Sequence, residues 1–353
     1  MSVDLDNPRL REEVDPQQML LCVEQFHKQC ADGEKLARGF DLPRFKKIEQ
    51  IVLCGMGGSA INGDLLRAYT ARQVSLPVEV VRHYSLPEYV GKKTLAILCS
   101  YSGNTEETLS AYQEAKQRSA KMVAVTTGGA LAQQCDRDGV PWMRIPGGYA
   151  PRAALGYSFM PLLVFFERWG LIKDQTRALK QTKKTLKASI RANSFTVPEK
   201  ENPAKQLARK LFNKIPVIYA DQEIFQPVAV RWRGQFNENA KTFVHTAVIP
   251  EMNHNEILGW ENPATALKKF HAVYLTDEGY HPQIKKRFDI MKKILSPFTG
   301  DIIEVYSQGK GRLARMFSTI NLGDFTSVYL AYLYGVDPTR IPAIDSLKEE
   351  LAK

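Results

Sequence analysis

Apolar and polar residues follow one another along the first part of the chain in an order that predicts alternating strands and helices. Short apolar runs at residues 48–54, 78–81, 94–99 and 121–126 predict strands, whereas residues 60–70 and 106–117 repeat apolar side chains at helical spacing. Strands that are apolar on both faces and are separated by helices are typical of a parallel sheet covered on both sides. The pattern therefore predicts an α/β fold.

The same alternation returns near the end of the chain. Strands are predicted at 216–220, 243–249, 272–276 and 301–305, and helices at 227–240, 283–295, 313–335 and 344–353. One helix is expected over 15–38, and residues 153–211 show only helical periods, first apolar and then basic. A length of 353 residues suits two domains at about 150 residues each. We therefore expect two similar α/β halves joined by helices.

Composition excludes several classes of protein. Hydrophobic residues make up 44% and charged residues 24% of the chain, which is ordinary for a globular protein and unlike disorder. The N-terminus shows no leader pattern and no apolar run approaches the roughly 18 residues of a membrane span, so secretion and membrane insertion are not expected. Five cysteines without C-x-x-C spacing favour reduced thiols and a cytoplasmic location. The net charge of +10 predicts an anionic partner without choosing its class.

A glycine-rich turn follows the first predicted strand. It reads Gly55-Met56-Gly57-Gly58-Ser59 and opens a helix, so an anion can approach the amides of the helix N-terminus. Gly55-x-Gly57-x-x-Ala60 also fits a permissive dinucleotide fingerprint, with Glu79 near the place of a ribose-binding acid. A phosphate turn, a dinucleotide turn and a plain tight turn all remain open at this point.

A second turn of the same kind follows the strand at 94–99. Its hydroxyl residues are Ser100, Ser102 and Thr105, which surround Gly103 and precede another helix. Three hydroxyls can hold a phosphate with neutral donors, although a single hydroxyl here can also serve only as a helix cap. A dinucleotide fold needs one such turn, so the second turn favours a phosphate ligand.

These turns resemble those of sugar isomerase (SIS) domains, and further segments resemble the bifunctional phosphoglucose/phosphomannose isomerase family. The segments are Pro151-Arg152, Phe236-Asn237-Glu238-Asn239-Ala240-Lys241 and Pro250-Glu251-Met252-Asn253-His254-Asn255-Glu256. The resemblance implies two SIS-type subdomains, each a mostly parallel sheet flanked by helices in three αβα layers. It suggests a leader at 1–45, SIS domains at 46–152 and 212–338, a helical connection at 153–211 and a C-terminal helix at 339–353.

The resemblance also implies an activity: metal-independent interconversion of glucose 6-phosphate, and of mannose 6-phosphate, with fructose 6-phosphate. In that family Glu238 matches the base that moves a proton between C1 and C2, and Arg152 matches the arginine that stabilises the cis-enediolate. His254 and Lys348 match the residues that open the sugar ring. The phosphosugar would contact Gly57, Gly58, Ser59, Ser100, Ser102 and Thr105. The family's histidine is supplied across a dimer interface, so a homodimer is expected.

Other readings compete with this one. A non-catalytic SIS module that senses sugar phosphates would usually carry a helix-turn-helix domain, and the residues before 48 show none. A nicotinamide-dependent dehydrogenase rests only on the first glycine turn. The histidines outside the motif, His27, His83, His245, His271 and His281, lack metal-ligand spacing, so no metal or other cofactor is expected. No recognisable nucleic-acid-binding module is present, and no nucleic-acid partner is expected.

The positive charge concentrates away from the turns. Twelve basic and three acidic residues lie between Lys173 and Lys214, a surplus of nine in this one stretch. Their helical spacing with few apolar residues predicts a solvated face that contributes at most a general field attracting a dianionic substrate. The phosphate itself is therefore assigned to the neutral hydroxyls and backbone amides of residues 100–105.

Overall fold

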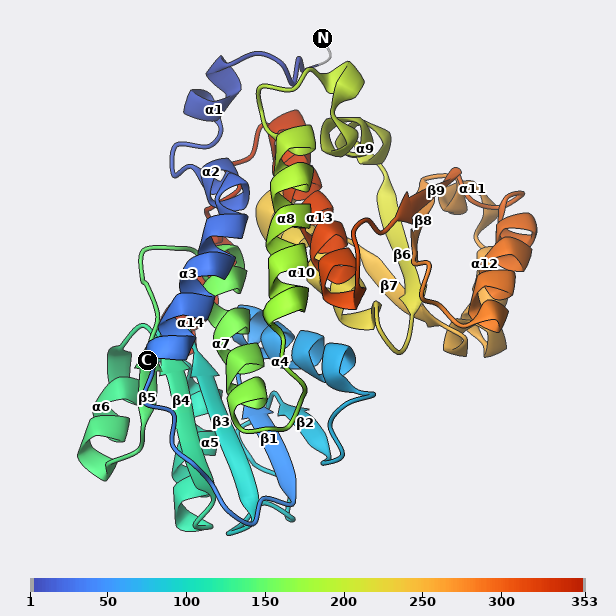
Figure 1. Ribbon diagram of the computed structural model, residues 1–353. Helices are drawn as coiled ribbons and strands as arrows, with labels where there is room; N and C mark the ends of the chain where they lie inside the picture. Colours follow the sequence, from blue (N-terminus) through green and yellow to red (C-terminus); the bar gives the residue numbers. More distant parts are fainter. Residues whose placement is uncertain (1–2, 352–353) are drawn as a thin grey trace. The chain divides into compact units, whose positions relative to one another are not determined.

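A computed structural model describes residues 3–351 of the chain, which divide into two compact units (Figure 1). The first unit consists of residues 25–183, and the second combines the segment before residue 25 with everything after residue 183. The leader expected at 1–45 and the helical connection expected at 153–211 are each divided between the two units. The last two positions of the expected helix at 344–353 lie outside the described residues.

The first unit is built on a five-stranded parallel sheet. Its elements are α3 (Phe26–Gly39), β1 (Gln50–Cys54), α4 (Gly57–Thr70), β2 (Val78–Val81), β3 (Thr94–Ser100), α5 (Glu106–Gln117), β4 (Lys121–Thr126), α6 (Gly129–Asp138), β5 (Trp142–Arg144), the 3₁₀ turn η1 (Pro151–Ala153), α7 (Leu155–Arg168) and the first turns of α8 (Thr176–Asn193). The strand order is β2-β1-β3-β4-β5, with every neighbouring pair parallel. The expected strands and helices are present, mostly to within two residues, and β2, β4 and α5 have the predicted bounds.

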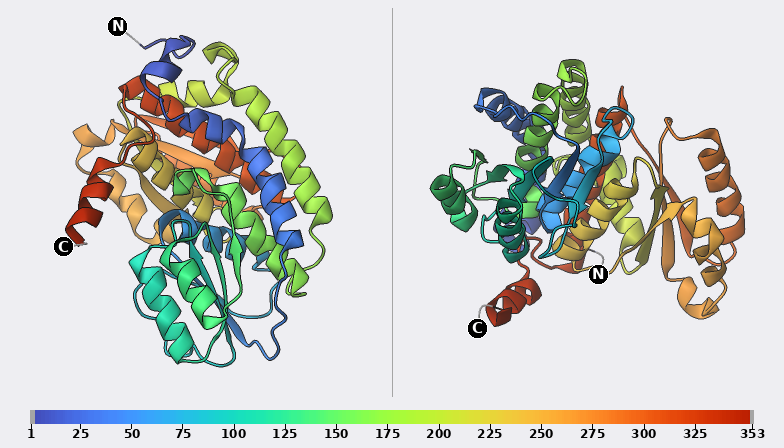
Figure 2. Two further views of the ribbon diagram at one scale, coloured as in Figure 1. Left: turned by 90° about the vertical axis from the view of Figure 1, so that its left-hand side faces the viewer. Right: turned by 90° about the horizontal axis from the view of Figure 1, so that it is seen from below.

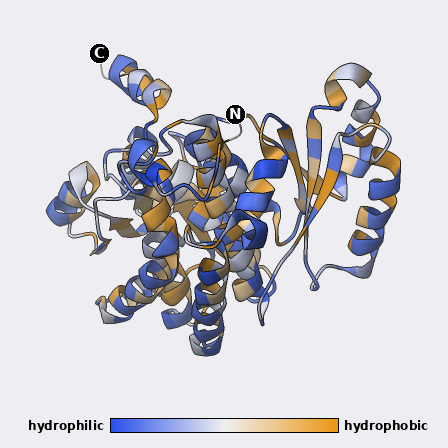
Figure 3. Cartoon of the chain, turned by 90° about the horizontal axis from the view of Figure 1, so that it is seen from above, coloured by the Kyte–Doolittle hydropathy of each residue, from blue (hydrophilic) through white to orange (hydrophobic). Residues whose placement is uncertain are grey.

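Both faces of this sheet are buried by helices, as the apolar strand sequences predict. One face carries Val52, Ala96 and Leu98, which form a single core cluster with residues of α5 and α6. The opposite face carries Leu53, against which Gly63 brings α4 so close that an added Cβ would lie 3.2 Å from the Leu53 Cβ. The first half thus has the expected three-layer αβα arrangement. The strands of the second unit, which lie at the right in Figure 3, are likewise largely hydrophobic.

The helix expected over 15–38 is instead two helices, so that prediction was wrong. A single residue, Gln25, separates α2 (Met19–Glu24) from α3, and this break coincides with the boundary between the units. α2 packs on α13 in one unit, and α3 packs on α7 in the other. The continuous run of apolar residues at helical spacing therefore faces two different cores. α6 and β5 were not predicted either; β5 has only three residues, which are too few for a strand pattern.

The second unit contains a four-stranded parallel sheet in the order β7-β6-β8-β9. Its elements are α1 (Arg9–Glu13), α2, most of α8, η2 (Glu199–Glu201), α9 (Pro203–Leu211), β6 (Ile215–Asp221), α10 (Gln226–Ala240), β7 (His245–Ile249), η3 (Glu251–His254), η4 (Glu256–Trp260), α11 (Ala264–Leu267), β8 (Phe270–Thr276), α12 (Pro282–Leu295), β9 (Asp301–Tyr306), α13 (Arg312–Tyr334) and α14 (Pro342–Leu351). α10 and α13 pack on each other. In the right-hand view of Figure 2 the orange helix α12 lies at the outer side of the sheet. The ring centroids of Phe288 in α12 and Tyr274 in β8 are 5.1 Å apart.

In the part of the chain that the structure describes, no helix combines the length and the apolar character needed to cross a membrane.

Candidate active site

The two glycine turns lie side by side at the carboxyl ends of β1 and β3. These strands are neighbours, yet the chain leaves β1 towards β2 on one side and then crosses over to β3 on the other. Such a change of direction is the topological switch point, where open parallel sheets leave a crevice for ligands. The first unit therefore has its natural ligand position between the two turns identified in the sequence.

The first turn is shaped by close backbone contacts. An added Cβ on Gly55 would lie only 2.7 Å from the carbonyl oxygen of Cys99, at the end of β3. α4 begins at Gly57, whose φ of +48° favours glycine, and the N-cap residue Met56 makes no side-chain cap bond. Ser59 accepts a hydrogen bond from the backbone N–H of Tyr101 at 3.1 Å. The glycines thus bring α4 near β3, and Ser59 joins the two turns.

Some hydroxyl groups of the second turn form hydrogen bonds within the turn itself. Ser100 is buried, with 1% of its surface exposed, and its hydroxyl lies 2.9 Å from that of Thr105 and accepts the N–H of Gly103 at 3.0 Å. Thr105 occupies the N-cap position of α5 but makes no side-chain cap bond. Helix capping alone therefore does not account for these hydroxyls. Ser102 is exposed, whereas the buried Ser100 stabilises the turn through its hydrogen bonds.

Glycine is required at the centre of this turn. Gly103 has a φ of +73°, and an added Cβ would lie 1.8 Å from the carbonyl oxygen of Gly128, in the loop after β4. Leu131 also donates its backbone N–H to the carbonyl oxygen of Gly103 at 2.9 Å. The loop after β4 and the first turn of α6 therefore both contact the second turn.

Arg152 lies beside the first turn. It belongs to η1 and only 4% of its surface is exposed. An added Cβ on Gly58 would lie 3.1 Å from the carbonyl oxygen of Pro151 and 3.4 Å from the backbone nitrogen of Arg152. The first unit thus brings together three segments that are distant in sequence: Gly57–Ser59, Ser100–Thr105 and Arg152.

Glu238 lies in the last turn of α10 in the second unit and is half-buried. The end of this helix is closed by Lys241, whose φ is +54° and whose Nζ donates to the carbonyl oxygens of Glu238 at 2.9 Å and Asn239 at 3.2 Å. A cation at a helix C-terminus also interacts favourably with the helix dipole. Lys241 therefore helps to end α10 two residues after Glu238.

His254 ends η3 and is exposed, in a segment anchored by Glu256. Glu256 Oε2 lies 3.0 Å from His245 Nε2, and its other oxygen accepts from the Tyr219 hydroxyl at 2.7 Å. The Tyr219 hydroxyl in turn accepts from Trp260 Nε1 at 2.8 Å. The hydrogen bond with Glu256 raises the pKa of His245, against the opposing effect of burial. Sequence reasoning missed this network, although Glu256 ends the motif that contains His254.

Lys348 lies on α14, which contains no buried residue, and its side chain is exposed. Glu238, His254 and Lys348 thus belong to three separate elements of the second unit, and the other seven predicted residues belong to the first unit.

The second unit has its own switch point, between β6 and β8, and the turn after β8 is closed by hydrogen bonds within the unit. Asp277 directly follows β8, and its carboxylate accepts from the Gly279 N–H at 2.7 Å, the Ser307 hydroxyl at 2.6 Å and Arg315 Nε at 2.7 Å. A backbone amide, a hydroxyl and a guanidinium are the donors that an anion would use. An internal carboxylate therefore follows β8, the strand that corresponds in sheet order to β3 of the first unit.

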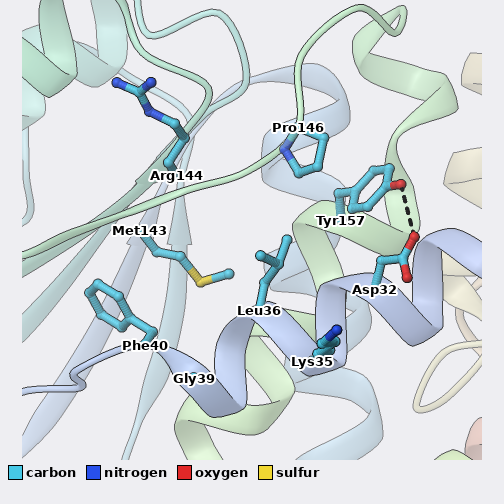
Figure 4. A pocket seen from close by; sticks show the side chains of 9 residues that line it. All are labelled: Asp32, Lys35, Leu36, Gly39, Phe40, Met143, Arg144, Pro146 and Tyr157. Atoms are coloured by element: carbon cyan, nitrogen blue, oxygen red, sulfur yellow. Dashed lines mark hydrogen bonds between the residues drawn. The ribbon is translucent and has the colours of Figure 1, made fainter.

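A surface hollow of the first unit contains none of the predicted site residues (Figure 4). It is lined by Asp32, Lys35, Leu36, Gly39, Phe40, Met143, Arg144, Pro146 and Tyr157. Glu79, the acid of the dinucleotide reading, is exposed on β2 and accepts a hydrogen bond from the Tyr89 hydroxyl. Within residues 3–351, no three His, Cys, Asp or Glu side chains gather as a metal site.

Comparison with known proteins agrees with the class of fold and site described above, that of the SIS domain. The SIS domain family matches residues 44–138, and the family described as "Bacterial phospho-glucose isomerase C-terminal SIS domain" matches residues 200–351. A solved structure of a hypothetical protein from Thermus thermophilus superposes with a TM-score of 0.74 at 15% identity, covering 98% of this chain and 92% of its own. That likeness concerns the fold alone.

Two curated relatives define the family more narrowly. The bifunctional phosphoglucose/phosphomannose isomerase of Caldicellulosiruptor bescii is 47% identical, covering 87% of this chain and 90% of the relative. The protein of the same name from Aquifex aeolicus is 37% identical, covering 94% and 97%. The chain belongs to the bifunctional phosphoglucose/phosphomannose isomerase family.

Proposed function

We propose that this protein interconverts glucose 6-phosphate with fructose 6-phosphate, and mannose 6-phosphate with the same ketose, without a metal ion. The observation that carries the proposal is the pair of turns joined by Ser59 at the switch point of the first sheet, beside Arg152. Neutral hydroxyls and the amides of two helix N-termini suit the phosphate of the substrate. Membership of the family supplies the choice of sugars.

In the proposed mechanism Glu238 removes the proton from C2 of the open-chain aldose, so that negative charge develops on the oxygens of a cis-enediolate, and then delivers the proton to C1. Arg152 stabilises the charge of the cis-enediolate because a guanidinium stays protonated and donates in a fixed geometry. The low exposure of Arg152 strengthens this interaction, since water screens it little. His254 and Lys348 transfer protons during ring opening, a step that suits an imidazole near neutrality.

A coupled assay tests the proposal. Turnover of glucose 6-phosphate and mannose 6-phosphate is measured in the presence of a chelator, for the wild type, Glu238→Gln and the exposed control Glu261→Gln. We expect comparable rates on both aldoses, insensitivity to the chelator and a loss of roughly 10²-fold or more for Glu238→Gln alone. Wild-type turnover in a folded Glu238→Gln variant contradicts the assigned base, and chelator sensitivity contradicts the metal-free mechanism.

We also propose that the protein is a homodimer that supplies His254 to its partner's site. The exposed position of His254, with Leu258 at 71% exposure four residues later in the chain, supports a surface that another subunit covers. If so, mixing inactive His254→Asn and Glu238→Gln homodimers and allowing subunit exchange restores up to about a quarter of wild-type activity, because half of the dimers regain one intact site. A monomer by light scattering, or no recovery after verified exchange, contradicts this proposal.

Binding and thermal-stability measurements on the purified protein distinguish two other functions. Binding of fructose 6-phosphate without turnover would favour a sugar-phosphate sensor, and thermal stabilisation by NAD but not by fructose 6-phosphate would favour a dehydrogenase. The cytoplasmic location is likewise a proposal, supported by five free cysteines.

A further inference from the structure

We propose that a buried polar ladder between α10 and α13 positions Glu238, and that Asp324 and Ser327 on α13 are positioning residues for it. The ladder consists of Arg231, Gln235 and Asn239 on α10 with Asp324 and Ser327 on α13. This inference rests on the proposed function of Glu238 as the base and adds the elements that hold its helix in register.

The first part of the ladder is a carboxylate shared by two residues one turn apart. Arg231 donates to Asp324 Oδ2 at 2.7 Å, and Gln235 donates to Oδ1 at 2.8 Å. The side chains of Arg231 and Asp324 are 4% and 5% exposed. Because each oxygen has its own donor, a shift of α10 along its axis breaks at least one of these bonds. The shared carboxylate therefore defines the axial register of α10.

The second part of the ladder lies next to Glu238. Asn239 Nδ2 donates to Ser327 Oγ at 2.9 Å, and both residues are fully buried. The Ser327 hydroxyl donates its own hydrogen to the carbonyl oxygen of Asp324 at 2.7 Å, in the same helix. This second bond leaves the Ser327 oxygen oriented to accept from Asn239. The contact is therefore directional.

The ladder adds what the apolar contacts of α10 do not supply. Burial of apolar surface is non-directional and tolerates small rotations, whereas Arg231, Gln235 and Asn239 recur every four residues along one side of the helix. A rotation by one residue, about 100°, would remove all three from α13. Glu238 follows any such motion directly, because it precedes Asn239 in the same turn. A base that serves both C1 and C2 tolerates only about 0.5 Å of displacement.

A matched pair of substitutions on α13 tests the inference. Ser327→Ala removes the acceptor of Asn239, whereas Thr326→Val removes a neighbouring buried hydroxyl that bonds only to the Leu322 carbonyl of its own helix. We expect kcat with fructose 6-phosphate to fall about 10- to 100-fold in Ser327→Ala, with KM within about twofold of the wild type. Thr326→Val should keep the wild-type kcat. Equal kcat values in folded samples of the two variants overturn the proposal.

A double-mutant cycle separates positioning from general destabilisation. If Asn239→Ala and Ser327→Ala act through one hydrogen bond, the double variant loses no more kcat than the more affected single variant. Losses that multiply overturn the assigned contact. Asp324→Asn, which replaces one accepting oxygen with a donor, should lower kcat in the same way. If that variant does not fold, the test rests on Ser327→Ala and the cycle.

Glu238→Gln measured in parallel keeps the two proposals distinct. If Glu238→Gln is inactive while Ser327→Ala keeps the kcat of the wild type, only the positioning role is contradicted. If Glu238→Gln remains active, Glu238 is not the base, and the proposal that the ladder positions the base fails with it.

Discussion

The backbone N–H of Tyr101 donates to the hydroxyl of Ser59 at 3.1 Å, and this bond joins the turn after β1 to the turn after β3. Ser59 lies in the first turn of α4, and Tyr101 lies between two hydroxyl residues of the second turn. The Tyr101 hydroxyl donates to the carbonyl oxygen of Pro146 at 3.0 Å and accepts the backbone N–H of Tyr149 at 3.1 Å, so the loop that leads to Arg152 is tied to the same residue. Tyr101 thus links three segments of the candidate phosphate site.

Loss of this link should weaken substrate binding. Ser59→Ala removes the hydroxyl that accepts the partly buried Tyr101 N–H, and the loss of such a hydrogen bond costs about 0.5–1.5 kcal/mol. We expect KM for fructose 6-phosphate to rise roughly tenfold. Ser110→Ala is the matched control, because its hydroxyl donates to the Tyr84 carbonyl on an exposed part of the same unit. Steady-state kinetics of both variants provides the comparison, and an unchanged KM in Ser59→Ala argues against the link.

Substitution of Gly103 should be far more costly than substitution of another glycine with positive φ. Gly103→Ala combines a φ of +73° with an added Cβ 1.8 Å from the Gly128 oxygen, whereas Gly139 has a φ of +66° and open space around the same position. Gly139→Ala is expected to lose about 1 kcal/mol of stability, from backbone strain alone. Gly103→Ala should lose more, and should also lose stabilisation by fructose 6-phosphate. Thermal unfolding with and without the ligand measures both, and similar behaviour of the two variants would refute the prediction.

The His245–Glu256 pair predicts a specific pH dependence of stability. Since Glu256 raises the pKa of His245 from its ordinary value of 6.5, protonated His245 is favoured in the folded state. Its contribution is fully present below pH 6.5 and is lost as the pH rises through the raised pKa. The difference in Tm between wild type and His245→Gln should therefore be largest near about pH 6 and disappear at alkaline pH. A difference that stays constant over this range contradicts the assignment.

Charge reversal on α8 should stabilise the protein. Lys180, Lys184 and Lys187 are exposed and spaced four and three residues apart, so they repel one another along one face of the helix. Lys184→Glu replaces two repulsions with two attractions worth about 0.2–0.5 kcal/mol each. We expect Tm to rise by roughly 1–3 °C at low salt, about half as much in Lys184→Gln, and little in either variant at high salt. A lower Tm for Lys184→Glu would show that these lysines contribute to the fold through other contacts.

Local patterns predicted the elements well where one element faces one core. β2, β4 and α5 begin and end as predicted because their apolar periods and flanking polar residues are unambiguous. The expected helix over 15–38 failed for the opposite reason: its apolar positions continue through Gln25 although the two sides of the break belong to different units. A periodic pattern records that a side chain is buried but not which core buries it.

The sequence by itself determined the α/β class, the two turns with their hydroxyls, and the family to which Glu238, His254 and Arg152 point, because these depend on local spacing and on motif order. Only the tertiary structure decided that the turns meet at a switch point, that Asp277 and its partners close the turn after β8 in the second unit, and that Asp324 and Ser327 hydrogen-bond to residues of α10. These relationships join residues many positions apart through strand order and buried hydrogen bonds. A linear pattern does not encode which distant donors and acceptors will satisfy one another.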